Sequence, residues 1–497
     1  MPLITSLLFL SSGLFLGWSL GANDASNVFG SAVGSRMLRF STAATLCSVF
    51  VILGAVIGGA GAAEGLGELG AVNALAGSFT TALAAALTVY WMTKLGLPVS
   101  TTQAVVGAIV GWNWFSGSAT DTEQLVRIFA TWVLCPVLAA LFSAGLYVLT
   151  VRWIRHRRPH LLRLDANVRG GLILAGVFGS YSLGANNIGN VMGMFVDSSP
   201  FRDIHLFGIA EIDGVQQLFL LGAIAIAVGV FTYSRRVMTT VGGSLMTLSP
   251  VGALVVVVAN ALVLFLFSSE DLSEAVRSVG LPAIPLIPVS SSQAVIGAVV
   301  GIGLLQGRRG LRQIRWSVLG RVASGWVTTP LIAALVGFVL LFVVQNVFGQ
   351  KVYEPVSYRL SPPALQRLAE LGYPAGRLGP PGPAFGSAAA FRTDLRRRVR
   401  LDRRGEAAVL ATAERTPLRV EAQRLRGEAA EGLSRRQIEA VEALDGSRFE
   451  HGWQLARALA DHSPAWRATD AAAERRLAGQ LQRLEKLFRL PAEPSGP

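Results

Sequence analysis

The sequence predicts an all-α polytopic membrane protein with two repeats of inverted topology, containing broken helices or re-entrant hairpins, and a small helical soluble tail at the C-terminus. Three observations carry this prediction: long apolar stretches, loops whose charge alternates in sign, and motifs that occur twice. Of 497 residues, 52% are hydrophobic and only 15% are charged, and the mean hydropathy is +0.49. Such a composition is typical of a chain that lies largely in a bilayer.

Two polar motifs recur inside this apolar sequence. The first reads WSLGANDASN at residues 18–27 and returns as YSLGANNIGN at residues 181–190. The second reads PVSTTQAVVGAIVG at residues 98–111 and returns as PVSSSQAVIGAVVG at residues 288–301. Because both copies appear in the same order, they indicate a duplicated unit.

A third match, WVLCP at residues 132–136 and WVTTP at residues 326–330, follows in the same order. Internal repeats whose apolar segments are broken by Gly or Pro are typical of secondary transporters, with the site at the repeat interface. The two cysteines, Cys47 and Cys135, lie in apolar segments and are interpreted as buried thiols, not as a disulfide.

Ten apolar stretches are each near or above the roughly 20 residues that a helix needs to cross the hydrocarbon of a bilayer. They are 4–34, 42–63, 71–95, 97–115, 125–151, 170–196, 206–232, 237–267, 281–306 and 316–348. Clusters of Gly, Pro or Ser interrupt several of them, which predicts broken helices and leaves the number of spans open between ten and twelve.

The charges of the short loops alternate along the chain and set the orientation. The basic loops lie at 36–39, 152–163, 235–236 and 308–315, and the acidic loops lie at 64–68, 121–123, 197–203 and 270–274. Basic loops remain in the cytoplasm, which places the N-terminus outside. Each repeat then has an odd number of crossings, so the two repeats have opposite topology.

Four segments follow from these patterns: membrane repeat 1 over 1–160, membrane repeat 2 over 161–349, a Pro/Gly-rich linker over 350–390 and a helical soluble tail over 391–497. In the tail, Leu477, Leu481, Leu484 and Phe488 share one helix face. The loop count places the tail outside. Long domains translocate regardless of charge, so its side stays open. No chemical motif marks it, and an accessory or partner-binding domain is expected.

Asp24 is an acidic residue within a predicted span, flanked by Asn23 and Asn27. An ionised carboxylate in hydrocarbon is costly unless a cation or a donor compensates it. Asparagine and backbone oxygens suit a small hard cation, so the motif predicts a sodium or proton site. A polar clasp between helices is the alternative. Asn187 replaces Asp24 in the second copy, and this leaves one carboxylate for the pair.

The second motif predicts the N-terminus of a half-helix within the membrane. Proline and the Ser/Thr run that follows it are typical of helix starts. Such a terminus presents backbone N–H groups and the positive end of the helix dipole, which favour an oxyanion. Neither copy contains Lys or Arg. Two such ends would enclose an oxyanion together with co-bound cations. The alternative is that the hydroxyls only hold helices together.

GANDASN with PVSTTQ, and their later copies, resemble the signatures of the inorganic phosphate transporter family over most of residues 1–349. The resemblance implies a cation-coupled oxyanion carrier, with sodium or protons and phosphate or sulfate. It implies coupling-cation ligands at Asn23, Asp24, Asn27, Asn186, Asn187 and Asn190. It implies a phosphate site lined by Ser100, Thr101, Thr102, Gln103, Ser290, Ser291, Ser292 and Gln293.

Two departures from that family's pattern favour sodium over protons. Members often carry Asp in both GAND copies, where this chain has Asn187 in the second. Many carry His after the Ser/Thr run, where Gln103 and Gln293 stand here. An amide does not titrate, so sulfate also stays open as a substrate.

The expected function is import of inorganic phosphate coupled to sodium by alternating access, in the cell membrane. A sulfate or other oxyanion permease of the same fold is one alternative, and an uncoupled anion channel is another. No nucleophile–base pair, phosphate loop or metal cluster supports an enzyme, and no cofactor or metal beyond sodium is expected. The charge pattern gives no nucleic-acid surface. The oligomeric state stays open, a homodimer included.

Overall fold

A computed structural model gives the fold, which divides into two compact units. The first unit holds Met1–Phe115 and Thr120–Glu354, and the second holds Ser116–Ala119 and Pro355–Pro497. The structure describes all residues except 1–2, 35, 68, 70–71, 95–98, 119, 197–198, 200, 202–203, 207–209, 242–247, 283, 374, 400, 402, 426–429, 431, 469–470 and 491–497.

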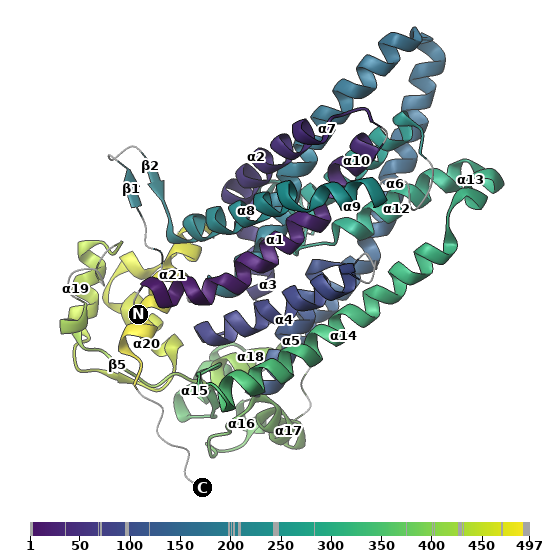
Figure 1. The fold of residues 1–497 in the computed structure, drawn as a ribbon. Coiled ribbons are helices and arrows are strands. Elements are labelled where there is room, and N and C mark those ends of the chain that lie inside the picture. Colours follow the sequence, from purple (N-terminus) through teal and green to yellow (C-terminus); the bar gives the residue numbers. More distant parts are fainter. Residues whose placement is uncertain are drawn as a thin grey trace. The chain divides into compact units, whose positions relative to one another are not determined.

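The described part of the first unit is helical apart from one short antiparallel hairpin (Figure 1). Its first half contains α1 (Leu3–Gly34), α2 (Phe40–Gly58), α3 (Ala60–Gly67), α4 (Leu75–Lys94), α5 (Thr101–Ser116) and α6 (Thr122–Arg157). Its second half contains α7 (Leu161–Met192), η1 (Gly193–Phe195), β1 (Ile204–Leu206), β2 (Ala210–Ile212), α8 (Gly214–Thr232), α9 (Ser234–Val241), α10 (Pro250–Ser268), α11 (Glu270–Ser278), α12 (Ser291–Leu305), α13 (Gly307–Gln313) and α14 (Trp316–Asn346).

Several of these helices suit a bilayer. Among the described residues, six helices are long and apolar enough to cross one: α2, α4, α6, α8, α10 and Leu319–Asn346 of α14. On α6 and α14, large apolar side chains are more than 60% exposed, namely Val133, Leu141, Leu331 and Leu335. Exposed apolar surface of this kind faces lipid in a membrane protein. The chain is a multi-pass membrane protein, as the sequence predicts.

Helices α5 and α12 are shorter than a membrane span. They have 16 and 15 residues, which at the rise of an α-helix gives about 22–24 Å against a hydrocarbon thickness of about 30 Å. Each begins directly after the Pro-Val-Ser that opens a copy of the second motif. They are the broken helices that the sequence predicts.

Prolines explain why α12 starts so late in its apolar stretch. The stretch 281–306 is helical only from Ser291, and its residues 284–290 form neither helix nor strand. Pro282, Pro285 and Pro288 lie before α12, and each lacks the backbone donor that a helix requires. This irregular segment leads the chain directly to the start of α12.

Glycines allow α1 to pack closely on α8, a helix of the other half. A Cβ atom at Gly21 would collide with the carbonyl of Ile226 on α8. On α8, a Cβ atom at Gly229 would collide with the carbonyl of Trp18 on α1. Only residues without a side chain permit backbones to approach so closely in a membrane bundle.

The same contact recurs between α7 and α2. A Cβ atom at Gly184 would collide with the carbonyl of Val51, and one at Gly54 would collide with the carbonyl of Tyr181. Gly184 and Tyr181 occupy the same places in their copy of the first motif as Gly21 and Trp18 occupy in theirs. The helix that carries the first motif in each half thus packs against the second helix of the other half.

The second unit forms its own cores. Its elements are β3 (Ser357–Tyr358), α15 (Pro362–Glu370), α16 (Ala375–Leu378), α17 (Ala388–Arg398), α18 (Arg403–Ala413), β4 (Glu414–Arg415), β5 (Leu418–Arg419), η2 (Ala422–Arg424), α19 (Arg435–Ala443), β6 (Arg448–Phe449), α20 (Gly452–His462), η4 (Pro464–Trp466) and α21 (Ala471–Phe488). The four apolar residues predicted to share a helix face lie on α21 and pack in one of these cores.

The segment 350–390, interpreted as a linker, contains β3, α15, α16 and the start of α17. Leu360, Leu368 and Leu378 from this segment are buried in a core with Phe391 of α17. Its prolines do not prevent this structure, because Pro362 and Pro363 occupy the first turn of α15, where the N–H group has no helical partner.

Candidate functional site

Matching serine caps begin the two half-helices. Ser290 is the N-cap of α12, and its hydroxyl accepts a hydrogen bond from the backbone N–H of Gln293 at 3.3 Å. The hydroxyl of Ser100 accepts the equivalent bond from the backbone N–H of Gln103, also at 3.3 Å. The caps satisfy one N–H group in each first turn and leave others directed past the helix end.

Asparagines of the first motif hold the chain at these helix starts. The amide of Asn186 on α7 donates to the carbonyl of Val289 at 2.8 Å and accepts from its N–H group at 3.0 Å. On α1, the amide of Asn23 donates to the carbonyl of Val99 at 3.5 Å. Each copy of the first motif therefore contacts the second motif of its own half.

Two further asparagines connect the halves. The amide of Asn27 on α1 donates to the hydroxyl of Ser291 on α12, and the amide of Asn190 on α7 donates to the hydroxyl of Thr102 on α5, both at 2.9 Å. Because each GAN motif contacts both helix starts, the four motif copies meet at one place. The structure thus brings the predicted residues together.

Asp24 and its counterpart Asn187 differ in their contacts. Asp24 is 4% exposed and accepts hydrogen bonds from the Asn23 amide, at 3.0 Å, and from the Ser291 hydroxyl. The amide of Asn187 instead donates to the Leu183 carbonyl of its own helix at 3.1 Å. The site therefore has a buried carboxylate on one side and a neutral amide on the other.

Some buried polar groups of the site have no protein partner. Both amide atoms of Gln103 and of Gln293 are buried without a hydrogen bond among the described residues, as are Oγ1 of Thr101 and Oδ1 of Asn190. Neither glutamine is more than 1% exposed. An unpaired buried polar group costs roughly 1–3 kcal/mol. Such groups at equivalent positions of both halves indicate a polar ligand.

The chemistry of the donor set fits a cation beside an oxyanion. A carboxylate, amide oxygens and hydroxyl oxygens are hard ligands of the kind that small cations prefer. The starts of α5 and α12 supply N–H groups and dipoles to an anion without any Lys or Arg. Apart from Asn27, which is partly buried, the fourteen predicted residues are at most 8% exposed.

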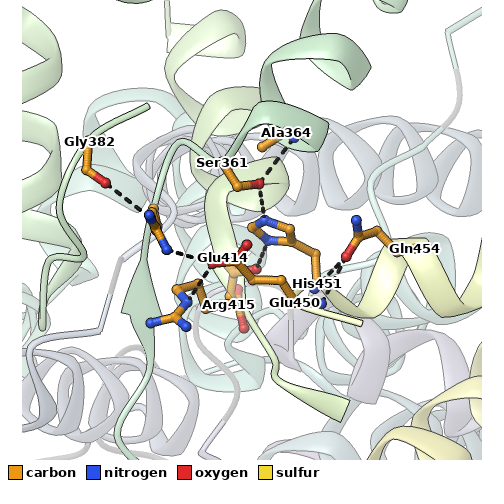
Figure 2. Close-up of polar contacts among 9 residues, drawn as sticks. Ser361, Ala364, Gly382, Glu414, Arg415, Glu450, His451 and Gln454 are labelled. Atoms are coloured by element: carbon orange, nitrogen blue, oxygen red, sulfur yellow. Dashed lines mark hydrogen bonds and ion pairs between the residues drawn. The ribbon is translucent and has the colours of Figure 1, made fainter. Parts of the chain in front are cut away.

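The second unit contains a serine–histidine pair that has a structural explanation. Nε2 of His451 lies 2.6 Å from Oγ of Ser361, and its Nδ1 lies 2.7 Å from the carbonyl of Glu414 (Figure 2). A carbonyl only accepts, so Nδ1 donates and Nε2 accepts from the hydroxyl. Burial lowers the pKa of His451 and favours this neutral ring.

The same hydroxyl of Ser361 accepts from the N–H group of Ala364 at 3.2 Å as the N-cap of α15. Both Ser361 and His451 are fully buried. The pair therefore fixes the start of α15 to the rest of the second unit and offers no nucleophile to a substrate.

Two buried polar residues are not among the site residues that the sequence predicts. Thr329 on α14 and Asn260 on α10 are fully buried, and their side-chain polar atoms have no partner in the described part of the chain. Thr329 lies in the third repeated motif, so the repetition of that motif could have marked it as a candidate. Asn260 stands alone in an apolar helix, where its polarity is the only signal.

Known proteins that are similar to this chain are transporters and permeases. A model of the phosphate transporter family matches residues 20–167, 157–337 and 283–371. A proposed phosphate permease of Methanocaldococcus jannaschii is 25% identical over 66% of this chain and 93% of its own length. One from Haemophilus influenzae is 23% identical over 68% of this chain and 96% of its own length.

A sulfate permease of Bacillus subtilis is 26% identical over 66% of this chain and 85% of its own length. The solved structure of a sodium-dependent phosphate transporter aligns with a TM-score of 0.54 at 22% identity, over 69% of this chain and 99% of that chain, so the helical fold is shared. These relatives are permeases and transporters, not enzymes. The chain belongs to the phosphate transporter family.

Proposed function

We propose that the chain is a secondary carrier that imports inorganic phosphate together with sodium by alternating access. One observation carries the proposal: hydrogen bonds from both GAN motifs converge on two capped half-helix starts, where the amides of Gln103 and Gln293 are buried and unpaired. The N–H groups and glutamine amides at the two helix starts suit a tetrahedral oxyanion. Asp24 and the surrounding oxygens suit sodium.

The relatives support this choice of ligands. The names of the Methanocaldococcus and Haemophilus relatives concern phosphate, and the solved transporter of similar fold is sodium-dependent. Sodium is favoured over a proton because Asp24 is the one titratable group among the fourteen site residues. Its neutral counterpart Asn187 retains an oxygen ligand without a proton to exchange.

Sulfate is the second candidate substrate, because a sulfate permease of Bacillus subtilis is as similar as the phosphate relatives. The amides of Gln103 and Gln293 can donate to either oxyanion and do not titrate. An uncoupled channel is less well supported, because the site residues are packed at 0–8% exposure, apart from the partly buried Asn27. A closed site that must open to each side in turn is the arrangement of a carrier.

We further propose that residues 1–160 and 161–349 are inverted repeats in the cell membrane, with the N-terminus outside. The equivalent crossings of α1 with α8 and of α7 with α2 support the duplication. The second unit, which includes the predicted tail 391–497 and also residues 355–390, would then form an accessory domain.

The test is uptake of radiolabelled phosphate and sulfate into proteoliposomes that contain the purified full chain. Phosphate uptake is expected to rise strongly with an inward sodium gradient, and excess unlabelled sulfate is expected to inhibit it weakly. Uptake of sulfate in preference to phosphate would identify the second candidate. Uptake that does not depend on sodium would contradict the coupling.

A further inference from the structure

An open hollow lies where α8 ends and α9 begins. Its volume is about 430 Å³, and it is lined by Thr232, Tyr233, Arg235 and Arg236. A volume of this size is typical of small-molecule sites. Both arginines are exposed, so the hollow opens to the surface of the first unit. Its lining residues belong to none of the four motif copies, so it is not part of the candidate site described above.

Aromatic side chains fix the rim of the hollow. The indole N–H of Trp18 on α1 donates to the Thr232 hydroxyl at 2.9 Å, and the rings of Trp18 and Tyr233 lie 5.8 Å apart. The Thr232 hydroxyl in turn donates to the Val228 carbonyl of its own helix at 2.7 Å. Tryptophan and tyrosine are enriched where membrane helices meet the headgroups of the bilayer. This pair therefore places the hollow at the level of the headgroups.

The charge around the hollow is positive. The guanidinium of Arg235 lies 5.9 Å from the centre of the Phe40 ring at the start of α2, so the basic loop 36–39 is adjacent. Residues 25–63 and 214–269 together contain four arginines, no lysine and no Asp or Glu. Clusters of arginine beside a membrane helix attract anionic lipid headgroups. An anion in the hollow would supply the charge complement that these two segments lack.

An apolar stripe leads along α8 to the hollow. Leu220, Ile224, Val228 and Phe231 are exposed and recur at the spacing of one helix face. The hollow begins at Thr232, directly after the last residue of this stripe. An apolar surface that ends in a basic hollow matches a phospholipid, in which acyl chains are joined to a charged headgroup.

The duplicated helix α2 shows which part of this arrangement is specific to α8. The equivalent crossings align Gly54 of α2 with Gly229 of α8. Exposed apolar residues recur along α2 as well. Past the helix ends, however, residues 58–61 read GGAG and residues 233–236 read YSRR. Contact with acyl chains is thus common to both helices, whereas the tyrosine and the arginines occur only after α8, at the end that the loop charges place in the cytoplasm.

We propose that the hollow at the junction of α8 and α9 binds an anionic phospholipid of the cytoplasmic leaflet. Its phosphate lies at Arg235 and Arg236, and an acyl chain lies along the stripe on α8. Helix α9 also packs on α1, so the bound headgroup stabilises α9 against the helix that carries the first motif (Figure 1). This site does not depend on which cation or oxyanion the chain carries.

Native mass spectrometry of the purified full chain in detergent tests the proposal, with phosphatidylglycerol and phosphatidylcholine of the same acyl chains as probes. The wild type is expected to retain one phosphatidylglycerol in preference to phosphatidylcholine. The double variant Arg235→Gln with Arg236→Gln removes both headgroup contacts and should lower phosphatidylglycerol affinity about 30-fold. The matched control is Arg308→Gln with Arg312→Gln, which removes the same charge from exposed positions on α13 and should leave the affinity unchanged.

Two results with the wild type alone keep the proposal falsifiable if the glutamine variant does not fold. Equal retention of the two lipids would overturn it. Release of the lipid by millimolar glycerol phosphate would also overturn it, because the hollow would then be a site for a free anion. Among the variants, equal phosphatidylglycerol affinity in the Arg235/Arg236 variant and the wild type, or an equal loss in the Arg308/Arg312 control, would contradict the site.

Discussion

Replacing Asp24 by asparagine removes the buried carboxylate from the site while leaving the fold intact. The second half shows why folding should survive, because Asn187 occupies the equivalent helical position and its amide bonds to the Leu183 carbonyl. Asp24 is 4% exposed, so little water screens its charge. At about 4 Å and an effective dielectric constant of about 20, a carboxylate attracts a monovalent cation by about 4 kcal/mol.

The amide oxygen of asparagine recovers part of this attraction, so a net loss of about 2–3 kcal/mol is expected, or about 30- to 150-fold in sodium affinity. Sodium activation of phosphate uptake in proteoliposomes measures the change, and Asp24→Glu, which keeps the charge, should retain part of the affinity. Equal sodium activation in Asp24→Asn and wild type would show that this carboxylate does not bind the coupling ion.

Three other results are expected. Thr101→Ala should raise the apparent KM for phosphate about tenfold, because it removes a hydrogen bond to a charged group, and sodium binding without phosphate should change much less; an unchanged KM would favour the helix-packing role. Gly54→Ala should lower the yield of folded protein, because the added Cβ meets a backbone carbonyl of α7. Gly145→Ala, with open space around it, should not lower the yield. Equal yields of the two variants would refute the close crossing. Cysteines at Glu123 and Arg157, at opposite ends of α6, should react with an impermeant thiol reagent outside and inside the cell respectively, and the reverse pattern would invert the topology.

Apolar length was sufficient to predict the helical membrane fold. It was not sufficient to locate helix ends within a stretch. Hydropathy does not distinguish a helix from the irregular segment before Ser291, where prolines exclude a helix. Likewise, the Pro/Gly-rich composition of 350–390 favours a linker, but Leu360, Leu368 and Leu378 bury enough apolar surface to order that segment.

The sequence names candidate site residues, but it does not give the contacts between them. The motifs name the residues, yet the sequence alone cannot say that Asn27 reaches Ser291 of the other half while Asn23 stays within its own. Those contacts depend on the glycine crossings that set the distance between helices. The unpaired state of Thr329 is a property of three-dimensional packing, although its repeated motif was visible in the sequence.

Concentrative uptake tests the central claim most directly. Proteoliposomes with the purified chain, with the membrane voltage clamped at zero and equal phosphate on both sides, would be given an inward sodium gradient as the only driving force. A sodium-coupled carrier must then accumulate phosphate inside above its external concentration, and collapse of the gradient by a sodium ionophore must release it. Phosphate that only equilibrates across the membrane under the same gradient would contradict the account, because an uncoupled pathway does no more than that.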